Sequence, residues 1–201
     1  MREGSLSGQT LVFPGRFQPF HNGHDEVVKR VMEVSERQLV LAVVCAIKLD
    51  SGSDRFDIES AEHFESSRNP FPPLAVHRML QELARVRYPE RPPQVLLIPR
   101  PSRGGNWTAI DQFFPGSRTW VVPDAGENWD ERKAEFFAAM GDDVIRVPHD
   151  PAVSGRDLRS AMNAGDWEAV ARGVPVEILP HLREALERPV ETDANRIGRN
   201  P

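Results

Sequence analysis

Cysteine is almost missing from this sequence, because Cys45 is the only one among 201 residues. A disulfide within the chain and a zinc site built from cysteines are therefore excluded. Cys45 lies inside the apolar run 39–47, which favours a buried small side chain over a reactive thiol. No apolar run reaches the roughly 20 residues of a membrane span, and residues 1–9 lack a signal-peptide core. We therefore expect a cytoplasmic protein with no membrane partner.

Lysine is also scarce, with only Lys29, Lys48 and Lys133 among 25 basic residues. The net charge of −5 argues against a nucleic-acid partner, which would require a basic surface patch. The length fits one domain with a real core. We place this domain at residues 1–187, with a helical C-terminal part from about 154, and expect the polar residues 188–201 to be a flexible tail.

Short apolar runs rich in β-branched residues alternate with longer amphipathic stretches along the chain. Five strands are predicted, at 10–13, 39–47, 94–98, 118–122 and 143–147. Helices are predicted between them at 23–34, 74–86, 107–114 and 129–140, and after them at 155–163, 167–172 and 176–186. Strict alternation predicts an α/β fold, a doubly wound five-stranded parallel sheet of the Rossmann-like kind with short C-terminal helices. Residues 50–73 show no periodicity and predict a lid, a binding loop or a disordered insertion.

A first motif, residues 15–24, reads Gly-Arg-Phe-Gln-Pro-Phe-His-Asn-Gly-His directly after the first predicted strand. Gly15 would let the backbone approach a phosphate at the carboxyl end of that strand. His21 and His24 are three residues apart at the start of the next helix, so both imidazoles can face its N-terminus. Free amides and the helix dipole favour an anion there. Such a pair could instead ligate a metal or cap the helix, but this context favours catalysis.

A second motif, residues 153–159, reads Val-Ser-Gly-Arg-Asp-Leu-Arg after the fifth predicted strand. Ser154 and Asp157 have the spacing of a capping box, which alone would explain both residues. The cap does not explain Arg156 and Arg159, which are three residues apart and could reach a phosphate. Two helix N-termini at one sheet edge would form a cradle for a triphosphate.

Together the two motifs resemble those of the HxGH, or cytidylyltransferase-like, nucleotidyltransferase superfamily, and residues 154–159 match its Ser-x-x-x-x-Arg signature. Within it, the chain looks most similar to archaeal-type nicotinamide mononucleotide adenylyltransferases. Further likenesses are Asn69-Pro70-Phe71 followed by Arg78, Leu97-Ile98-Pro99, and Gly165-Asp166-Trp167. The resemblance spans about residues 11–186.

The resemblance implies a role for each matching residue. The implied catalytic residues are Arg16, His21, His24 and Arg159. The implied nucleotide-binding residues are Gly15, Phe17, Gly23, Ser154, Gly155 and Arg156. The implied acceptor-binding residues are Arg78, Asn106 and Trp107. No residue is implied as a metal ligand, and Mg²⁺ is the expected cofactor, bound through the substrate phosphates.

The acceptor loop departs from the family pattern. Ser102 stands where the family usually has aspartate, and Trp107 follows Asn106 immediately rather than after a spacer. The indole of Trp107 could stack on an acceptor ring or could be the first buried residue of a helix. The pattern is compatible with a relative that has changed its acceptor.

The implied reaction transfers a nucleoside monophosphate from a nucleoside triphosphate to a small phosphate-bearing acceptor and releases pyrophosphate. ATP plus nicotinamide mononucleotide, giving NAD, is the best match. A phosphate monoester, with a second pKa of about 6, is already anionic at neutral pH. The histidines are therefore expected to act as hydrogen-bond donors rather than as general bases.

Two other functions remain open on the sequence alone. One is a CTP-dependent cytidylyltransferase that acts on a phosphonate or another small phosphorylated metabolite, because the acceptor loop is altered. The other is a non-catalytic nucleotide sensor, since a fold does not fix a function. Homo-oligomers are frequent among relatives of this kind, so self-association is one expected state.

Overall fold

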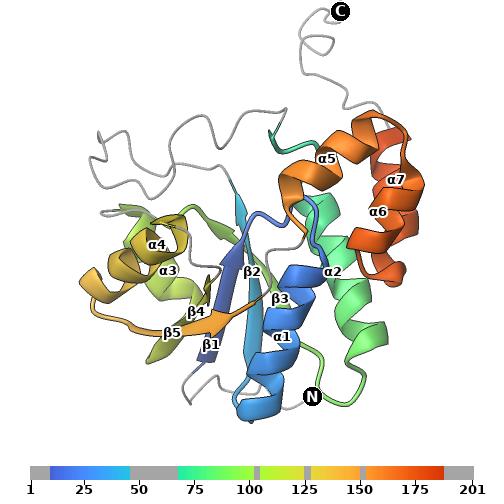
Figure 1. Ribbon diagram of the computed structural model, residues 1–201. Coiled ribbons are helices and arrows are strands. Elements are labelled where there is room, and N and C mark those ends of the chain that lie inside the picture. The colour runs from blue at the N-terminus through green and yellow to red at the C-terminus, as the bar shows by residue number, and fades with distance from the viewer. Residues whose placement is uncertain (1–9, 46–67, 102–104, 125–127, 150–152, 188–201) are drawn as a thin grey trace, which may run out of the picture.

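Five parallel strands form one sheet in the order β3-β2-β1-β4-β5 (Figure 1). The computed structural model describes residues 10–45, 68–101, 105–124, 128–149 and 153–187. The strands are β1 (Thr10–Gly15), β2 (Leu39–Cys45), β3 (Gln94–Pro99), β4 (Arg118–Asp124) and β5 (Asp143–Pro148). All five predicted strands are confirmed, and four of them extend slightly further at the carboxyl end than predicted. The end of the predicted second strand, 46–47, lies outside the described residues.

Helices cover both faces of the sheet, with α1 and α2 on one side and α3 and α4 on the other (Figure 1). They are α1 (Asn22–Val34), α2 (Pro73–Arg87), α3 (Gly105–Phe113) and α4 (Asn128–Ala139). The C-terminal helices are α5 (Gly155–Asn163), α6 (Trp167–Gly173), the short 3-10 helix η3 (Val176–Ile178) and α7 (Leu179–Glu187). The last predicted helix is thus divided in two. Pro180, which has no N–H to donate, stands in the first turn of α7, where a helix tolerates proline.

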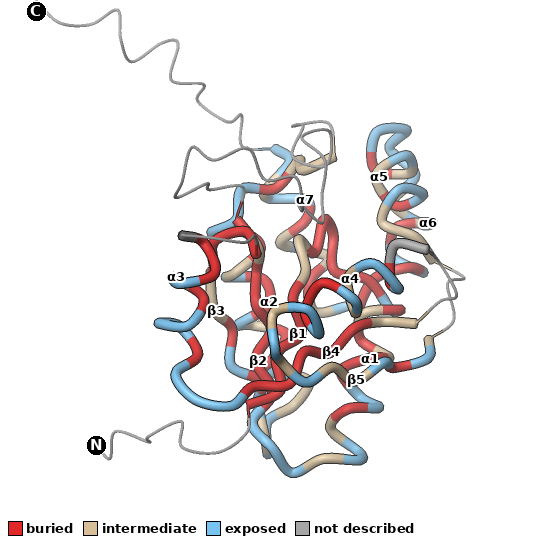
Figure 2. Tube along the Cα trace, turned by 90° about the vertical axis from the view of Figure 1, so that its left-hand side faces the viewer, coloured by how far each residue is buried: buried red, intermediate tan, exposed pale blue. Residues whose placement is uncertain are grey.

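Alternate side chains of the strands enter two separate cores. In β1, Leu11 and Phe13 pack with the core under α1 and α2, whereas Val12 packs with the core under α3 and α4. In β2, Leu41 and Ala42 divide in the same way. The central strands are buried throughout (Figure 2). This double burial explains the nearly continuous apolar runs in the sequence.

The sheet opens between β1 and β4 at its carboxyl edge. The paired residues of β1 and β2 continue to Gly15 and Val43, whereas those of β1 and β4 end at Val12 and Trp120. The chain crosses from β1 to β2 on one side, and β4 pairs on the other, so this is the point where the strand order reverses. Such a point is where a doubly wound sheet binds its ligand.

A buried ionic network fixes α1 against α2 and η3. Asp25, only 2% exposed, accepts a hydrogen bond of 2.6 Å from the Tyr88 hydroxyl. It also pairs with Lys29 at 2.7 Å and with Arg87 at 3.0 Å. Arg87 in turn binds Glu177 at 3.0 Å. The network holds α1 in place, and His21 caps this helix while His24 lies in its first turn.

Several other expectations can be compared with the structure. The thiol of Cys45 is buried, as expected, and burial raises its pKa. None of the described helices has the length and apolar character needed to cross a membrane. Most of the predicted loop 50–73 and the whole tail 188–201 lie outside the described residues.

Candidate active site

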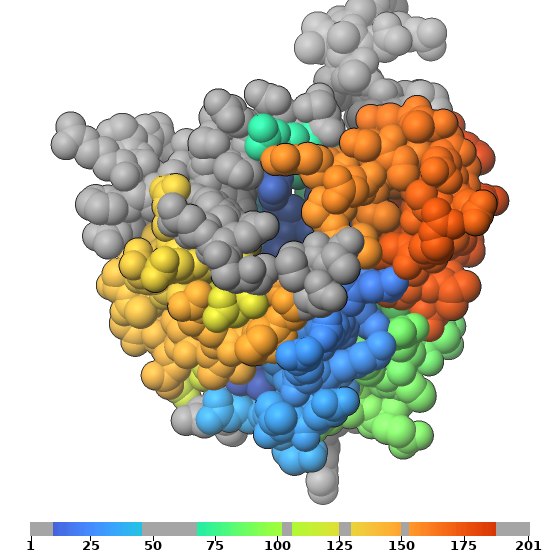
Figure 3. Space-filling view, viewed as in Figure 1, coloured from blue at the N-terminus to red at the C-terminus, as the bar shows by residue number. Residues whose placement is uncertain are grey.

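A cavity of about 250 Å³ lies at the carboxyl edge of the sheet, beside the ends of β1 and β4. Figure 3 shows blue atoms of the chain after β1 in a hollow beside the orange atoms of α5. The charged side chains on its wall are all basic: Arg16, Arg100, Lys133, Arg156 and Arg159. Within the described part of the chain, no carboxylate lines it. Because the whole chain carries a net charge of −5, this concentration of positive charge marks the cavity as an anion site.

The turn after β1 depends on Gly15. A Cβ at this position would lie 2.6 Å from the Phe17 ring, closer than real Cβ atoms come. Phe17 itself has a φ of 52°, a left-handed conformation that is uncommon for a residue with a side chain. The ring is 2% exposed and packs against Phe13 and Phe20. Packing of the ring holds the turn in this shape, and both Gly15 and Phe17 lie on the cavity wall.

The turn is tied to the segment 69–71, far away in the sequence. The Gln18 side chain donates to the Phe71 carbonyl at 2.7 Å and accepts from its N–H at 3.0 Å. Arg16 donates to the side-chain oxygen of Asn69 at 3.2 Å. The Asn-Pro-Phe segment thus supports the turn after β1.

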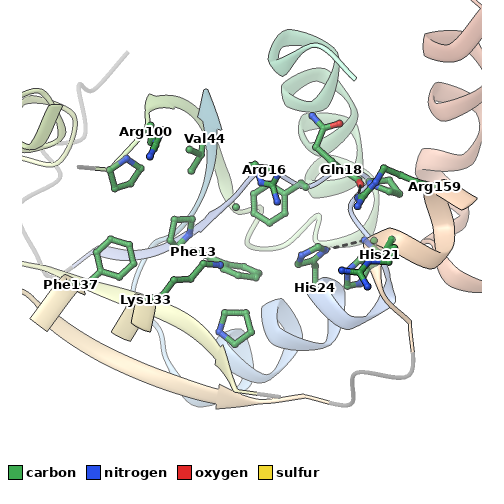
Figure 4. A pocket seen from close by; sticks show the side chains of 18 residues that line it. Phe13, Arg16, Gln18, His21, His24, Val44, Arg100, Lys133, Phe137 and Arg159 are labelled. Atoms are coloured by element: carbon green, nitrogen blue, oxygen red, sulfur yellow. Dashed lines mark hydrogen bonds between the residues drawn. The ribbon is translucent and has the colours of Figure 1, made fainter. Parts of the chain in front are cut away.

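His21 and His24 meet at the start of α1, as predicted. Their rings stack with centroids 3.8 Å apart, and both line the cavity (Figure 4). The backbone N–H of His21 donates to Nδ1 of His24 at 3.2 Å. Nδ1 of His24 is thus an acceptor, so the neutral ring carries its proton on Nε2 and can donate from there.

Both histidines are held in the neutral form. Burial lowers the pKa of His21 to about 4, with further lowering by His149 and Arg159. Burial also lowers the pKa of His24 well below its usual value, with further lowering by His21 and Lys133. At neutral pH these rings therefore offer N–H donors to an anion and do not hold a proton for acid catalysis.

The second motif forms both the predicted cap and the predicted arginine cluster. Ser154 caps α5 by accepting from the Asp157 backbone N–H at 3.2 Å, and its hydroxyl donates to the Asp157 carboxylate at 2.7 Å. Arg159 donates to the Gln18 carbonyl at 2.6 Å, which joins the two motifs. Gly155 and Arg156 line the cavity with Arg159, whereas Ser154 lies outside the lining.

Several guanidinium groups gather around Arg159. Burial lowers the pKa of Arg159, and the charges of Arg16, Arg68 and Arg156 lower it further. Like charges held this close repel one another, so an anion between them would be bound strongly. Arg68 belongs to this cluster but was missed, because the sequence around it has no periodicity.

Gly23 stands between the motif histidines in the sequence and is not part of the cavity lining. A Cβ there would lie 3.2 Å from the His21 ring and 3.3 Å from the ring of His149, which follows β5. His149 was also missed, although its place after a strand end could have revealed it. Its Nδ1, like that of His21, is buried and has no hydrogen-bond partner among the residues that the structure describes.

The three predicted acceptor residues do not gather at the cavity. Arg78 is exposed on α2 and is not part of the lining. Asn106 is fully buried and donates to the Arg100 carbonyl at 3.0 Å. Trp107, 8% exposed, packs between Trp120 and Phe136 in the core under α3 and α4. Of the two interpretations of Trp107, the structure shows the buried one, because α3 begins two residues earlier than predicted and directs the indole inward.

Two cations on the wall were not predicted from the sequence. Arg100 follows β3 directly, so the rule that strand ends gather at one edge could have identified it. Lys133 lies within α4, where its position gave no such signal. Both enter the cavity at the end away from His21 and Arg159 (Figure 4).

Comparisons with known proteins agree with this architecture. A family model described as cytidylyltransferase-like matches residues 12–63, which contain the first motif. The chain is 29% identical over 187 residues to a nicotinamide-nucleotide adenylyltransferase of Halorubrum lacusprofundi, covering 90% of this chain and 93% of that protein.

One solved structure shows a similar fold. Thermotoga maritima TmcAL, solved with alpha-thio ATP, aligns with a TM-score of 0.61 at 11% identity. The alignment covers 90% of this chain but only 56% of TmcAL, so the chain spans about half the length of that protein. NadR, in a complex with NAD and AMP-PNP, aligns with a TM-score of 0.47 at 15% identity over 78% of this chain and 43% of NadR.

Proposed function

We propose that this chain, which is similar to cytidylyltransferase-like proteins and to a nicotinamide-nucleotide adenylyltransferase, adenylates nicotinamide mononucleotide. In this reaction AMP moves from ATP to the acceptor phosphate, which gives NAD and pyrophosphate. The similarity to a nicotinamide-nucleotide adenylyltransferase along nearly the whole chain supports the choice of both substrates. The chain is a nucleotidyltransferase, and the acceptor is the new part of the proposal.

One observation carries the proposal: two neutral histidines and a cluster of arginines line the same cavity, with no carboxylate from the described residues. This combination suits a polyanion, and its histidines are weak bases because their pKa values are lowered. Phosphoryl-type transfer depends mainly on positioning of the reacting groups and on neutralisation of the phosphate charge. Arginines and neutral imidazole N–H donors can supply both.

The step itself needs no proton transfer at the start. An oxygen of the acceptor phosphate, already anionic at a second pKa of about 6, attacks the α-phosphorus in line. A new P–O bond forms, the bond to the bridging α–β oxygen breaks, and pyrophosphate leaves with that electron pair. Nε2 of His24 donates to oxygens of the transferred group as charge develops on them, while Arg16 and Arg159 hold the departing phosphates.

The proposed reaction includes Mg²⁺, which would be bound by the phosphates of the triphosphate. Among the residues that the structure describes, no three His, Cys, Asp or Glu side chains form a group that could hold a metal. Magnesium commonly keeps several waters and binds through substrate phosphates, so such a group is not required. The protein residues act on the phosphates directly, and none is assigned to the ion.

Pyrophosphate release tests the proposal directly. The protein is incubated with ATP or CTP, each combined with nicotinamide mononucleotide or aminoethylphosphonate. We expect release with ATP and nicotinamide mononucleotide, together with formation of NAD. Release only with CTP and the phosphonate would reject this acceptor and support a cytidylyltransferase. Tight ATP binding with no release across all four combinations would support a nucleotide sensor.

The cytidylyltransferase remains the second candidate for a structural reason. Arg78, which the family resemblance assigns to the acceptor, is exposed and lies outside the cavity lining. Trp107, the residue expected to stack on a nicotinamide ring, is buried in a core. The residues that the resemblance assigns to acceptor binding therefore do not line the cavity. This difference is compatible with a different small phosphorylated acceptor.

A further inference from the structure

We propose that His149 is a positioning residue for His21: a ring N–H of His149 donates to Nδ1 of His21 and thereby fixes the His21 proton on Nε2. Nδ1 of His21 is the buried nitrogen, which leaves Nε2 to donate into the cavity that the ring lines. The inference rests on the proposed function for its catalytic consequence and adds a residue from outside both motifs. His149 does not line the cavity, so it acts on the phosphates only through His21.

His149 reaches His21 from the end of β5. It is the first residue after the strand, and its backbone N–H donates to the Asp124 carbonyl at the end of β4, at 3.4 Å. β5 also contacts α1, the helix that His21 caps. The His149 ring is half-buried. A residue that follows a parallel strand lies at the carboxyl edge of the sheet, where the two motifs also meet.

Gly23 is the point at which the two imidazole rings meet. A Cβ on Gly23 would lie 3.2 Å from both Nδ1 and Cε1 of His21 and 3.3 Å from Cδ2 of His149. Both rings therefore lie against the same backbone position, one at the start of α1 and the other after β5. Because glycine has no side chain, it leaves room for this approach.

Each of these two rings has one buried nitrogen without a partner. Nδ1 of His21 and Nδ1 of His149 are both buried, and neither is hydrogen-bonded to any of the described residues. A neutral imidazole has one nitrogen that donates and one that accepts, and buried polar atoms are nearly always paired. Nδ1 of His24, by contrast, accepts from the His21 backbone N–H at 3.2 Å. His21 therefore needs a donor that does for it what this backbone N–H does for His24.

A half-turn of the His149 ring about its Cβ–Cγ bond accounts for both nitrogens at once. It exchanges Nδ1 with Cδ2, so that Nδ1 moves to the edge of the ring that lies against Gly23, beside Nδ1 of His21. Cδ2 takes the buried place that Nδ1 leaves, and a carbon needs no partner there. Because the ring has nearly the same outline in both orientations, the half-turn needs little additional room. When Nδ1–H of His149 donates, Nδ1 of His21 is the acceptor and the His21 proton stays on Nε2.

The electrostatics of the site agree with this contact. Burial is the main cause of the lowered pKa of His21, and the interaction with His149 is the next. The His149 ring is thus close enough to act on His21. A neutral His21 ring carries a single proton, so the nitrogen that holds this proton decides whether the ring can donate to a phosphate.

Nitrogen NMR of the full-length protein without nucleotide tests the tautomer directly. In a neutral histidine ring, the protonated nitrogen and the bare nitrogen resonate far apart, and His21→Gln identifies the signals of His21. We expect the Nε2–H form in the wild type at neutral pH. His149→Phe keeps a flat ring without nitrogen and should show a mixture of both forms. An Nδ1–H ring in the wild type would overturn the inference, and so would wild-type His21 signals in His149→Phe.

Kinetics of pyrophosphate release then measure what the tautomer contributes. The kcat of His149→Phe should fall roughly tenfold, less than the loss of a whole donor would cause, while KM for ATP changes little. His149→Asn, whose amide nitrogen can take the place of Nδ1–H, should recover much of kcat and the Nε2–H form of His21. His181→Phe on α7, outside the cavity lining, is the matched control and should keep both wild-type readings.

The outcomes separate this inference from the proposed function. If the wild type releases no pyrophosphate with any pair of substrates, the proposed function fails, and the NMR spectra still decide whether His149 fixes the tautomer of His21. If His149→Phe lowers kcat but leaves the tautomer unchanged, His149 is merely structural and the inference is wrong. A changed tautomer with wild-type kcat would also reject the positioning role. The wild-type spectrum needs no variant of His149, so an Nδ1–H ring there rejects the inference even if His149→Phe does not fold.

Discussion

The side chain of Gln18 pairs with the backbone of Phe71 through two hydrogen bonds, one of 2.7 Å to the carbonyl and one of 3.0 Å from the N–H. The two residues are 53 positions apart. The Gln18 amide binds both the N–H and the carbonyl of Phe71, as the backbone of a residue in a neighbouring β-strand would. It fixes the segment 69–71 against the turn after β1, next to Arg159, which donates to the Gln18 carbonyl.

Replacing Gln18 by alanine should destabilise the protein and weaken ATP binding together. The change leaves two buried polar groups of Phe71 without partners, at a cost of about 1–3 kcal/mol in the free energy of unfolding. Urea denaturation measures this cost. Gln38→Ala is the control, because Gln38 is exposed and its side chain donates only to the Leu39 carbonyl among the described residues. Equal stabilities of the two variants would mean that the Gln18–Phe71 pair contributes nothing.

The sequence alone was enough to predict the sheet and to predict that residues of the two motifs meet at its carboxyl edge. Buried parallel strands produce continuous apolar runs, and the two motifs follow strand ends, which gather at one edge. The acceptor half could not be predicted in this way. Gly105 begins α3, although glycine is a poor helix former, so the expected helix started too late and Trp107 was left free to face the cavity.

Periodicity could have corrected the role assigned to Arg78 by resemblance. Val76, Leu80 and Leu83 are buried on one face of α2, which places Arg78 on the solvent side. No comparable pattern identifies Lys133 or the contact between Gln18 and Phe71. Each depends on how segments far apart in the sequence pack together.

Replacing His24 by alanine should lower kcat by roughly 10²-fold or more with little change in KM, because it removes one donor to the transition state. Steady-state kinetics with both substrates at saturation measures the effect. His181→Ala on α7, outside the cavity lining, is the control and should keep wild-type kcat. A His24→Ala enzyme with near-normal kcat would remove His24 from the mechanism.

Stability should decline as the pH falls from 6.5 towards 4. The pKa of His21 is about 4 in the folded protein, against 6.5 for an ordinary histidine. Between these values the unfolded chain binds a proton more readily than the native one, so acid favours unfolding. The contribution of His21 reaches about 3 kcal/mol below the lower pKa. In His21→Gln this part of the pH dependence should disappear from urea titrations, and an unchanged dependence would contradict the burial of a neutral ring.

Replacing Arg159 by alanine should weaken ATP binding about tenfold or more, on the scale of a hydrogen bond to a charged group. Exposed Arg156 lines the same wall, and Arg156→Ala should cause a smaller loss because solvent screens its charge. Titration calorimetry with ATP measures both. Arg172→Ala on α6, where Arg172 pairs with Glu168 in solvent, is the control. If all three variants bind ATP as the wild type does, the cluster is not the triphosphate site.

Replacing Asp25 by alanine should reduce stability by about 3–5 kcal/mol, because it leaves the partly buried Arg87 and the Tyr88 hydroxyl without their shared carboxylate. Glu26→Ala, which breaks the more exposed pair with Arg30 on the same helix, should cost less than about 1 kcal/mol. Urea denaturation compares the two variants directly. The kcat of folded Asp25→Ala should remain close to that of the wild type, because Asp25 does not line the cavity. A large loss of kcat without a loss of stability would instead mean that the network tunes the histidines of α1.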